Sequence, residues 1–148
     1  MITFGVVHTK EKALELSYAS IGFFNEMGYD LNIDDLMEEI ERASEQGVVV
    51  YAKHYDLYIG LIIGLKITQF LLKQEWLHER CFFVHPEYRM KKVADKLQDI
   101  FCEWARINGC KSVIIAPCVF GSSEPKLVAD FLKRKGYSLH GYSMRKEL

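Results

Sequence analysis

The chain has 148 residues, the size of one domain, and 49% are hydrophobic, which is enough for one sizeable core and argues against disorder. The formal net charge of -1 disfavours a protein that binds nucleic acid or an anionic membrane surface. Its four cysteines show no CxxC pattern and no histidine at zinc-ligand spacing. We therefore expect reduced thiols in a cytoplasmic protein and no structural metal. The N-terminus lacks the charged region of a signal peptide, and the longest apolar run, Leu57 to Leu65, is too short to span a bilayer.

Charge is distributed unevenly along the chain. Residues 1–75 carry 6 Lys and Arg against 12 Asp and Glu, a net of -6, whereas residues 76–148 carry 13 against 8, a net of +5. One interpretation is an anion-binding side opposite a side that tolerates cations. Ordinary scatter of surface charges is the other interpretation, and the sequence leaves both open.

The first part of the chain predicts one strand followed by two helices. Apolar residues alternate with small or polar ones over residues 2–6, as in a strand. Thr9 can cap a helix over about 10–27, and a second helix is expected over 33–46 with Gly47 as its C-terminal cap. The side chains expected to face the core recur at spacings of three and four: Leu14, Tyr18, Ile21 and Phe24 in the first helix, and Leu36, Ile40 and Ala43 in the second.

The middle part of the chain changes to the period of a strand. Residues 48–53, 57–68 and 75–84 predict an antiparallel meander, with a tight turn at 54–56. The segment 57–68 is apolar along nearly its whole length. We therefore expect a central strand that is covered on both faces.

A helix over 93–107, a short strand over 112–116, a helix over 124–135 and a final strand over 137–145 are expected next. Because the first of these helices is a crossover, the strands before and after it should be parallel. The order is therefore β-α-α-β-β-β-α-β-α-β. This order predicts an α/β fold with a mixed sheet and helices on both faces, in a single domain over residues 1–148.

The turn between the strand ending at Val84 and the helix after it is suited to holding a phosphate. Pro86 ends the strand because it has no N–H to donate. The first N–H groups of the helix lack partners within it, and the helix dipole is positive there. Arg89, Lys91 and Lys92 add charge-assisted donors. The simpler alternative is a set of solvated cations at the start of an ordinary helix.

Residues 82–94 read Phe-Phe-Val-His-Pro-Glu-Tyr-Arg-Met-Lys-Lys-Val-Ala, which resembles motif A of the GNAT N-acyltransferases. In that family a hydrophobic-x-Val strand end precedes His-Pro-x-Tyr-Arg and then Q/R-x-x-G-x-G/A at a helix start. Residues 131–137 are similar to the family's closing signature, and the element order agrees across nearly the whole chain. The resemblance implies that this loop holds the pyrophosphate of acetyl-CoA. The cofactor-binding residues it implies are Phe82, Phe83, Val84, Arg89, Met90, Lys91, Lys92, Val93 and Ala94.

Three positions depart from the family pattern. Lys92 replaces the central glycine of the loop, Leu132 replaces the tyrosine that serves many members as general acid, and Pro125 falls near the position of an upstream asparagine. The resemblance implies an acetyl-CoA-dependent N-acyltransferase in which the amine of a small molecule or a protein attacks the thioester directly. The departures keep an alternative open, a catalytically inactive GNAT-fold protein that binds CoA or a protein partner.

The resemblance also suggests where the chemistry would occur. We expect a β-bulge near Phe83 that exposes an N–H to the oxyanion. His78 falls where some members of the family carry a glutamate that acts as the general base. Glu79 is the next residue and lies on the opposite face of the strand. Tyr142 is a candidate substitute for the missing acid. The simpler alternatives are a half-exposed strand histidine and a core tyrosine.

The acceptor is expected beside residues 26–30, and the acidic second helix could attract a cationic amine. A solvated helix face explains the same carboxylates more simply. The expected partners are therefore acetyl-CoA and an amine acceptor, without nucleic acid or membrane, and a homodimer is compatible with these observations.

Overall fold

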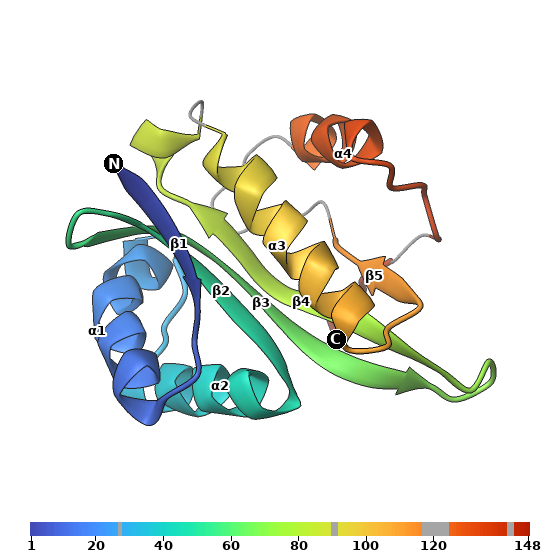
Figure 1. Cartoon of the computed structure of the whole chain (residues 1–148), viewed down its shortest axis with the longest axis horizontal. Coiled ribbons are helices and arrows are strands. Elements are labelled where there is room, and N and C mark those ends of the chain that lie inside the picture. Colours follow the sequence, from blue (N-terminus) through green and yellow to red (C-terminus); the bar gives the residue numbers. More distant parts are fainter. Residues whose placement is uncertain (27, 90–91, 117–124, 142–143) are drawn as a thin grey trace.

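The computed structural model describes residues 1–26, 28–89, 92–116, 125–141 and 144–148. One five-stranded sheet, in the order β1-β2-β3-β4-β5, forms its centre (Figure 1). The elements in chain order are β1 (Ile2–Val6), α1 (Lys10–Glu26), α2 (Ile33–Gln46), β2 (Gly47–His54), β3 (Leu57–Gln69), β4 (Gln74–Val84), the short 3-10 helix η1 (Pro86–Tyr88), α3 (Val93–Ile107), β5 (Ser112–Ile114) and α4 (Pro125–Arg134).

The sheet is mixed, as predicted. Strands β1 to β4 pair antiparallel with their neighbours in sequence, whereas β5 pairs parallel to β4 after the crossover through α3. Helices α1 and α2 cover one face of the sheet and α3 covers the other (Figure 1). The prediction that β3 is covered on both faces is confirmed, because its residues 58–64 are all buried.

Each face of the sheet has its own hydrophobic cluster. On one face Leu36 and Ile40 of α2 pack with Ile63 of β3, and on the other Leu97 and Phe101 of α3 complete the cluster. All five side chains are at most 4% exposed. Burial of this much apolar area is the main favourable term in folding, and it holds β3 and β4 firmly beneath the helices.

The predicted inward face of α1 is partly wrong. Leu14 is 40% exposed and Tyr18 is 62% exposed. The face that packs on the sheet carries smaller residues instead, including Ser17 and Ser20, whose hydroxyls donate to the carbonyls one turn earlier at 2.7 and 2.6 Å. Because these hydroxyls are satisfied within the helix, they can be buried without cost from unpaired polar groups.

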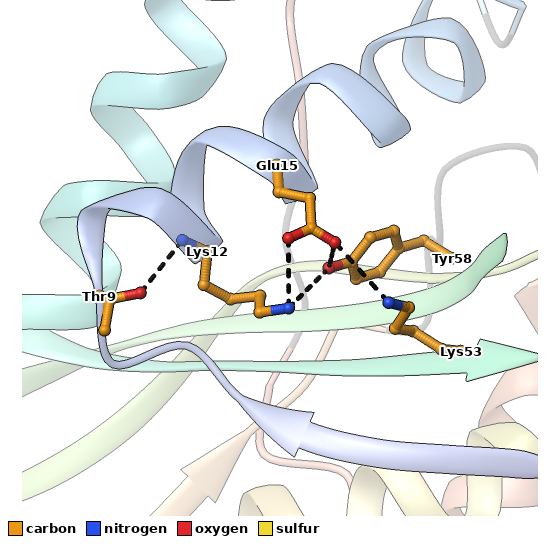
Figure 2. A network of polar contacts seen from close by, with 5 residues as sticks. All are labelled: Thr9, Lys12, Glu15, Lys53 and Tyr58. Atoms are coloured by element: carbon orange, nitrogen blue, oxygen red, sulfur yellow. Dashed lines mark hydrogen bonds and ion pairs between the residues drawn. The ribbon is translucent and has the colours of Figure 1, made fainter. Parts of the chain in front are cut away.

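A polar network fastens the start of α1 to the sheet (Figure 2). Thr9 caps the helix as predicted, its hydroxyl accepting from the Lys12 N–H at 3.1 Å. The Tyr58 hydroxyl donates to Glu15 at 2.7 Å, and Lys12 and Lys53 lie 3.3 and 3.6 Å from the same carboxylate. Burial and the hydrogen bond to Glu15 raise the pKa of Tyr58 to about 12, so this hydroxyl stays protonated.

Gly47 is the C-cap of α2, as predicted, and it also begins β2, with an extended backbone rather than the left-handed conformation. A Cβ at Gly47 would lie 2.0 Å from the carbonyl oxygen of Gly64 on β3, so only glycine permits this close approach.

The final strand expected over 137–145 is not formed by the described residues of that segment, 137–141, 144 and 145. The strand it would pair with, β5, is three residues long and offers few main-chain partners. Side-chain contacts hold the segment instead: the His140 ring meets Trp76 edge-on at 5.3 Å, and the Tyr137 hydroxyl lies 3.1 Å from both Gln98 Nε2 and Cys102 Sγ.

Candidate active site

Strands β4 and β5 lie side by side over only part of their length. Trp76 to His78 pair with Ser112 to Ile114, whereas residues 79–84 continue along β3 alone among the described residues. Figure 1 shows β4 running on past the end of β5. The second half of β4 therefore leaves one main-chain edge without a neighbouring strand in the described part of the chain.

The direction of the main-chain groups on this edge follows from strand alternation. His85 donates its N–H to Ile59 of β3 at 2.7 Å, so the N–H groups of Val84 and Phe82 point away from β3. The Val84 carbonyl, on the same side, accepts from Arg89 Nε at 3.0 Å. The side chains of Phe82, Phe83 and Val84 are at most 7% exposed, so only the main chain of these predicted cofactor residues can contact a ligand.

The β-bulge is present, but its predicted position near Phe83 is wrong. Phe83 pairs regularly with Leu61, whereas Ile63 faces Cys81 and the next residue, Gly64, faces Glu79, which leaves Arg80 as the extra residue. The space over Gly64 is filled by Phe101, whose ring a Cβ at that glycine would approach to 2.5 Å. The bulge thus coincides with the point where β4 loses its second neighbour.

Glu79 lies at the point where β4 and β5 diverge. Burial raises the pKa of its carboxyl to about 7, against the opposing effects of a main-chain hydrogen bond from Ala116 and of the Arg80 charge. Ala116 lies just after β5, so this hydrogen bond links Glu79 of β4 to the segment that follows β5. A carboxyl with this pKa is divided between both protonation states near neutral pH, as a general base requires.

His78 lies next to Glu79 but in the paired half of β4, opposite Ile114. Burial, followed by the nearby His140, lowers the pKa of His78. Its ring stacks on Trp76 with centroids 6.2 Å apart. Of the three predicted catalytic residues, His78 and Glu79 are consecutive in β4, and Tyr142 lies outside the described residues.

The loop that follows β4 is held in place by side chains at both ends. His85 Nδ1 accepts from the Glu87 N–H at 3.3 Å, and the Tyr88 hydroxyl shares a hydrogen bond of 2.7 Å with Nδ1 of His54. His54 ends β2, so this bond ties the loop to the β2–β3 hairpin. Nothing in the sequence around His54 marks it as a partner of the loop.

Lys92 has a φ of 59° at the start of α3, in the left-handed region. Glycine adopts this conformation without penalty, so the backbone itself gives a reason for the glycine in the family pattern. The Lys92 side chain is exposed, whereas Val93 is buried and Ala94 half-buried, so the latter two can offer a ligand only their N–H groups. Met90 and Lys91 lie outside the described residues.

The end of α4 closes over the outer face of α3. Lys135 lies 2.6 Å from Asp95 and 2.7 Å from Asp99, and these carboxylates raise its pKa to about 12. Leu132, at the position of the family's acidic tyrosine, is 4% exposed and belongs to the core. A proton donor is therefore absent at that position.

A cavity of about 440 Å³ opens on the other face of the sheet, beside the bulge. Its walls are mainly apolar and come from the end of α1, the segment after it, α2 and β3: Phe24, Tyr29, Leu31, Leu36 and Ile63. Arg80 and Cys81 of the bulge line it as well, together with Asp35 and Glu39 of α2. Tyr29 belongs to the rim that was expected over residues 26–30.

The described residues contain no group of three or more His, Cys, Asp or Glu arranged to hold a metal ion. Within the same residues, no helix combines the length and the apolar character needed to cross a membrane.

Comparison with known proteins identifies the class. The model of the acetyltransferase (GNAT) family matches residues 15–127, and the chain belongs to this family. No curated protein matches it.

Solved structures share the fold at low identity. They include ribosomal-protein-alanine N-acetyltransferase from Brucella melitensis biovar Abortus 2308, with a TM-score of 0.74 and 11% identity over 100% of this chain and 99% of that one. An acetyltransferase of Trypanosoma brucei has a TM-score of 0.73 and 21% identity over 100% of both chains. AAC(6')-Iy, solved with a bisubstrate analog made from CoA and acetylneamine, has a TM-score of 0.74 and 13% identity over 99% and 98%.

These findings confirm the resemblance, the α/β fold with its mixed sheet, and the expectation of an acetyltransferase that uses acetyl-CoA. They do not favour the alternative of an inactive binding protein.

Proposed function

We propose that this protein transfers the acetyl group of acetyl-CoA to the amine of a small molecule or a protein, with Glu79 as the general base. The observation that carries the proposal is the divergence of β4 from β5 directly at a half-buried carboxyl whose pKa is raised to about 7. A base whose pKa lies near the working pH is substantially deprotonated and still binds a proton strongly enough to take it from the amine.

The chain offers a continuous binding surface for acetyl-CoA. The N–H groups of the first turn of α3, at Val93 and Ala94, and the charges of Arg89 and Lys92 suit the pyrophosphate, as does the sequence position of Met90 and Lys91. The unpaired edge of β4 at Val84 offers a main-chain N–H to a carbonyl of the pantetheine amides. In this proposal the thioester lies toward the bulge and Glu79.

The reaction needs three things from the chain. The amine nitrogen attacks the thioester carbon, and Glu79 takes the proton that the nitrogen loses. The N–H of Phe82 points away from β3 and can donate to the oxygen that becomes negative. When the C–S bond breaks, the sulfur keeps the electron pair, and a thiol with a pKa of about 8.5 leaves readily as the thiolate. The absence of a proton donor at Leu132 is therefore compatible with turnover.

His78 is the other candidate base, because burial lowers its pKa and keeps it neutral. Its place in the paired half of β4 favours Glu79. Tyr142 stays a prediction as the acid.

The cytoplasmic location stays a prediction, based on four cysteines without a CxxC pattern. A homodimer stays a prediction for sedimentation equilibrium.

The proposal is tested by acetyl-CoA binding and by thiol release. At 100 times its Kd, a ligand that binds only the folded state stabilises by about 2.7 kcal/mol, so acetyl-CoA should raise the melting temperature. With an amine acceptor present, free CoA should then appear in a thiol assay. No thermal shift at millimolar acetyl-CoA would contradict the proposal, and a shift without CoA release across an amine panel would favour the binding protein instead.

A further inference from the structure

The cavity beside the bulge has a mainly apolar interior. Phe24, Leu36 and Ile63 are at most 5% exposed and form its floor, while Tyr29 is 40% exposed at its rim. An apolar wall gains binding energy from an apolar ligand and loses it with a strongly hydrated one. The interior therefore favours a ligand with an apolar body.

The charges around the cavity are largely compensated, although α2 carries six acidic residues. Glu39 is held by Arg42 Nη2 at 2.5 Å and by Arg80 Nε at 3.0 Å. Asp35 is the lining carboxylate that has no ion pair among the described residues. Since a polycation needs several uncompensated carboxylates, the acidity of α2 in the sequence does not translate into a polycation site.

The size of the cavity limits the ligand further. A volume of about 440 Å³ is near the lower end for ligand pockets. It therefore suits a small ligand. The lining residues Arg80 and Cys81 directly follow Glu79 on β4, so the cavity adjoins the segment of the strand that carries the proposed base.

From these three observations we infer that the acceptor is a small primary monoamine with an apolar body, rather than a polyamine or an amino sugar. The inference rests on the proposed acetyl transfer. It changes the expectation drawn from the acidic second helix, because Arg42 and Arg80 pair with Glu39, and Asp35 is then the one lining carboxylate without an ion pair among the described residues.

The test compares three amines by kcat/KM in the CoA-release assay: 3-phenylpropylamine, n-propylamine and spermidine. The first two have similar amino groups and differ in the apolar body. An apolar pocket discriminates by about tenfold or more for such a difference, so 3-phenylpropylamine should exceed both others by at least about tenfold. An equal or higher kcat/KM for spermidine would overturn the inference.

Variants locate the effect at the cavity. Tyr29→Ala and Leu31→Ala should each lower kcat/KM for 3-phenylpropylamine about tenfold and lower that for n-propylamine less, because the shorter chain contacts less of the cavity wall. The matched control is Tyr18→Ala, which removes a 62% exposed tyrosine of α1 outside the cavity lining. If the control had the same effect as Tyr29→Ala, the cavity would not be the acceptor site. Leu31→Ala keeps the test decisive if Tyr29→Ala unfolds.

Binding separates this inference from the proposed reaction. Calorimetric titration of 3-phenylpropylamine in the presence of CoA should show binding that Tyr29→Ala weakens and that spermidine does not reproduce. Such binding without turnover of any amine would retain the ligand class and refute the transferase. Absence of binding at millimolar 3-phenylpropylamine would overturn the inference that the acceptor is an apolar monoamine, even if acetyl-CoA binds to the protein.

Discussion

The two halves of β4 have the same neighbour on one side and different surroundings on the other. From Trp76 to His78 the strand lies between β3 and β5, and its main-chain groups belong to the sheet. Over residues 79–84 it has β3 alone among the described strands, and the N–H groups of Phe82 and Val84 are directed away from it. The difference teaches that an interruption in sheet pairing leaves main-chain N–H groups available to the proposed thioester site.

The interruption coincides with the β-bulge. At the bulge, Arg80 is the extra residue, and the phase of β4 changes between Glu79 and Cys81. Cys81 belongs to the cluster under α1 and α2, and Phe82 belongs to the cluster under α3. Packing on both faces of the sheet therefore fixes which face each of these side chains occupies after the bulge. The predictions below change one half of β4, or its support, and leave the other half intact.

The largest effect should come from removing the proposed base. Glu79→Gln keeps the shape of the side chain but cannot accept the proton, so kcat/KM should fall about 10²–10⁴-fold. His78→Gln, in the paired half, is the matched control and should retain most of the activity. If instead His78→Gln lost activity and Glu79→Gln kept it, the base would belong to the paired half of β4.

The same substitution should stabilise the protein at high pH. The pKa of Glu79 is raised from 4.5 to about 7, so the folded state disfavours its ionised form. The cost is absent below pH 4.5, grows between pH 4.5 and 7, and reaches about 3 kcal/mol above pH 7. Urea unfolding of Glu79→Gln should therefore show a gain of up to about 3 kcal/mol at pH 8 and none at pH 4. Equal stability of the two proteins at pH 8 would mean that the carboxyl is not desolvated.

Support of the bulge from β3 can be weakened without touching β4. Gly64→Ala would place a Cβ 2.5 Å from the Phe101 ring, and overpacking of this kind costs about 1–3 kcal/mol in urea unfolding. Gly22→Ala in α1 is the control, because no atom lies within 4 Å of its Cβ and alanine favours a helix by about 0.5–1 kcal/mol. A neutral Gly64→Ala would show that the bulge tolerates movement of Phe101.

The smallest effect concerns the loop at the end of the unpaired half. Lys92→Gly removes a side chain from the left-handed region and should stabilise by about 1 kcal/mol, measured by urea unfolding. Lys96→Gly inside α3 is the control and should destabilise by about 1 kcal/mol. Lys92→Glu should weaken CoA binding in calorimetry, and unchanged affinity would show that Lys92 does not contact the phosphates.

Much of the fold was predictable because its signals are local. The period-2 runs placed β2, β3 and β4 to within a residue or two, and the helix between β4 and β5 required those two strands to be parallel. The face of α1 was not predictable from spacing alone, because the sheet accepts Ser17 and Ser20 in place of Leu14 and Tyr18. The prediction of a final strand over 137–145 was wrong for a related reason, because the pairing of that strand depends on how far β5 extends.

The candidate site was predictable in its residues and not in its geometry. Motif spacing identified His78, Glu79 and the loop at Arg89, but a bulge has no sequence period, so its place at Arg80 was not apparent. The bond between His54 and Tyr88 joins residues 34 positions apart and has no sequence signal. The raised pKa of Glu79 depends on burial by surrounding elements, which only the folded chain provides.

The most direct test of the central claim is a carbon-13 NMR titration of the glutamate side-chain carboxyls. In the wild-type protein, one resonance should titrate near pH 7, and it should be missing from Glu79→Gln while the other resonances remain. If every glutamate of the folded protein titrated near its ordinary value of about 4.3, Glu79 would not be a buried base and the account of the active site would be contradicted.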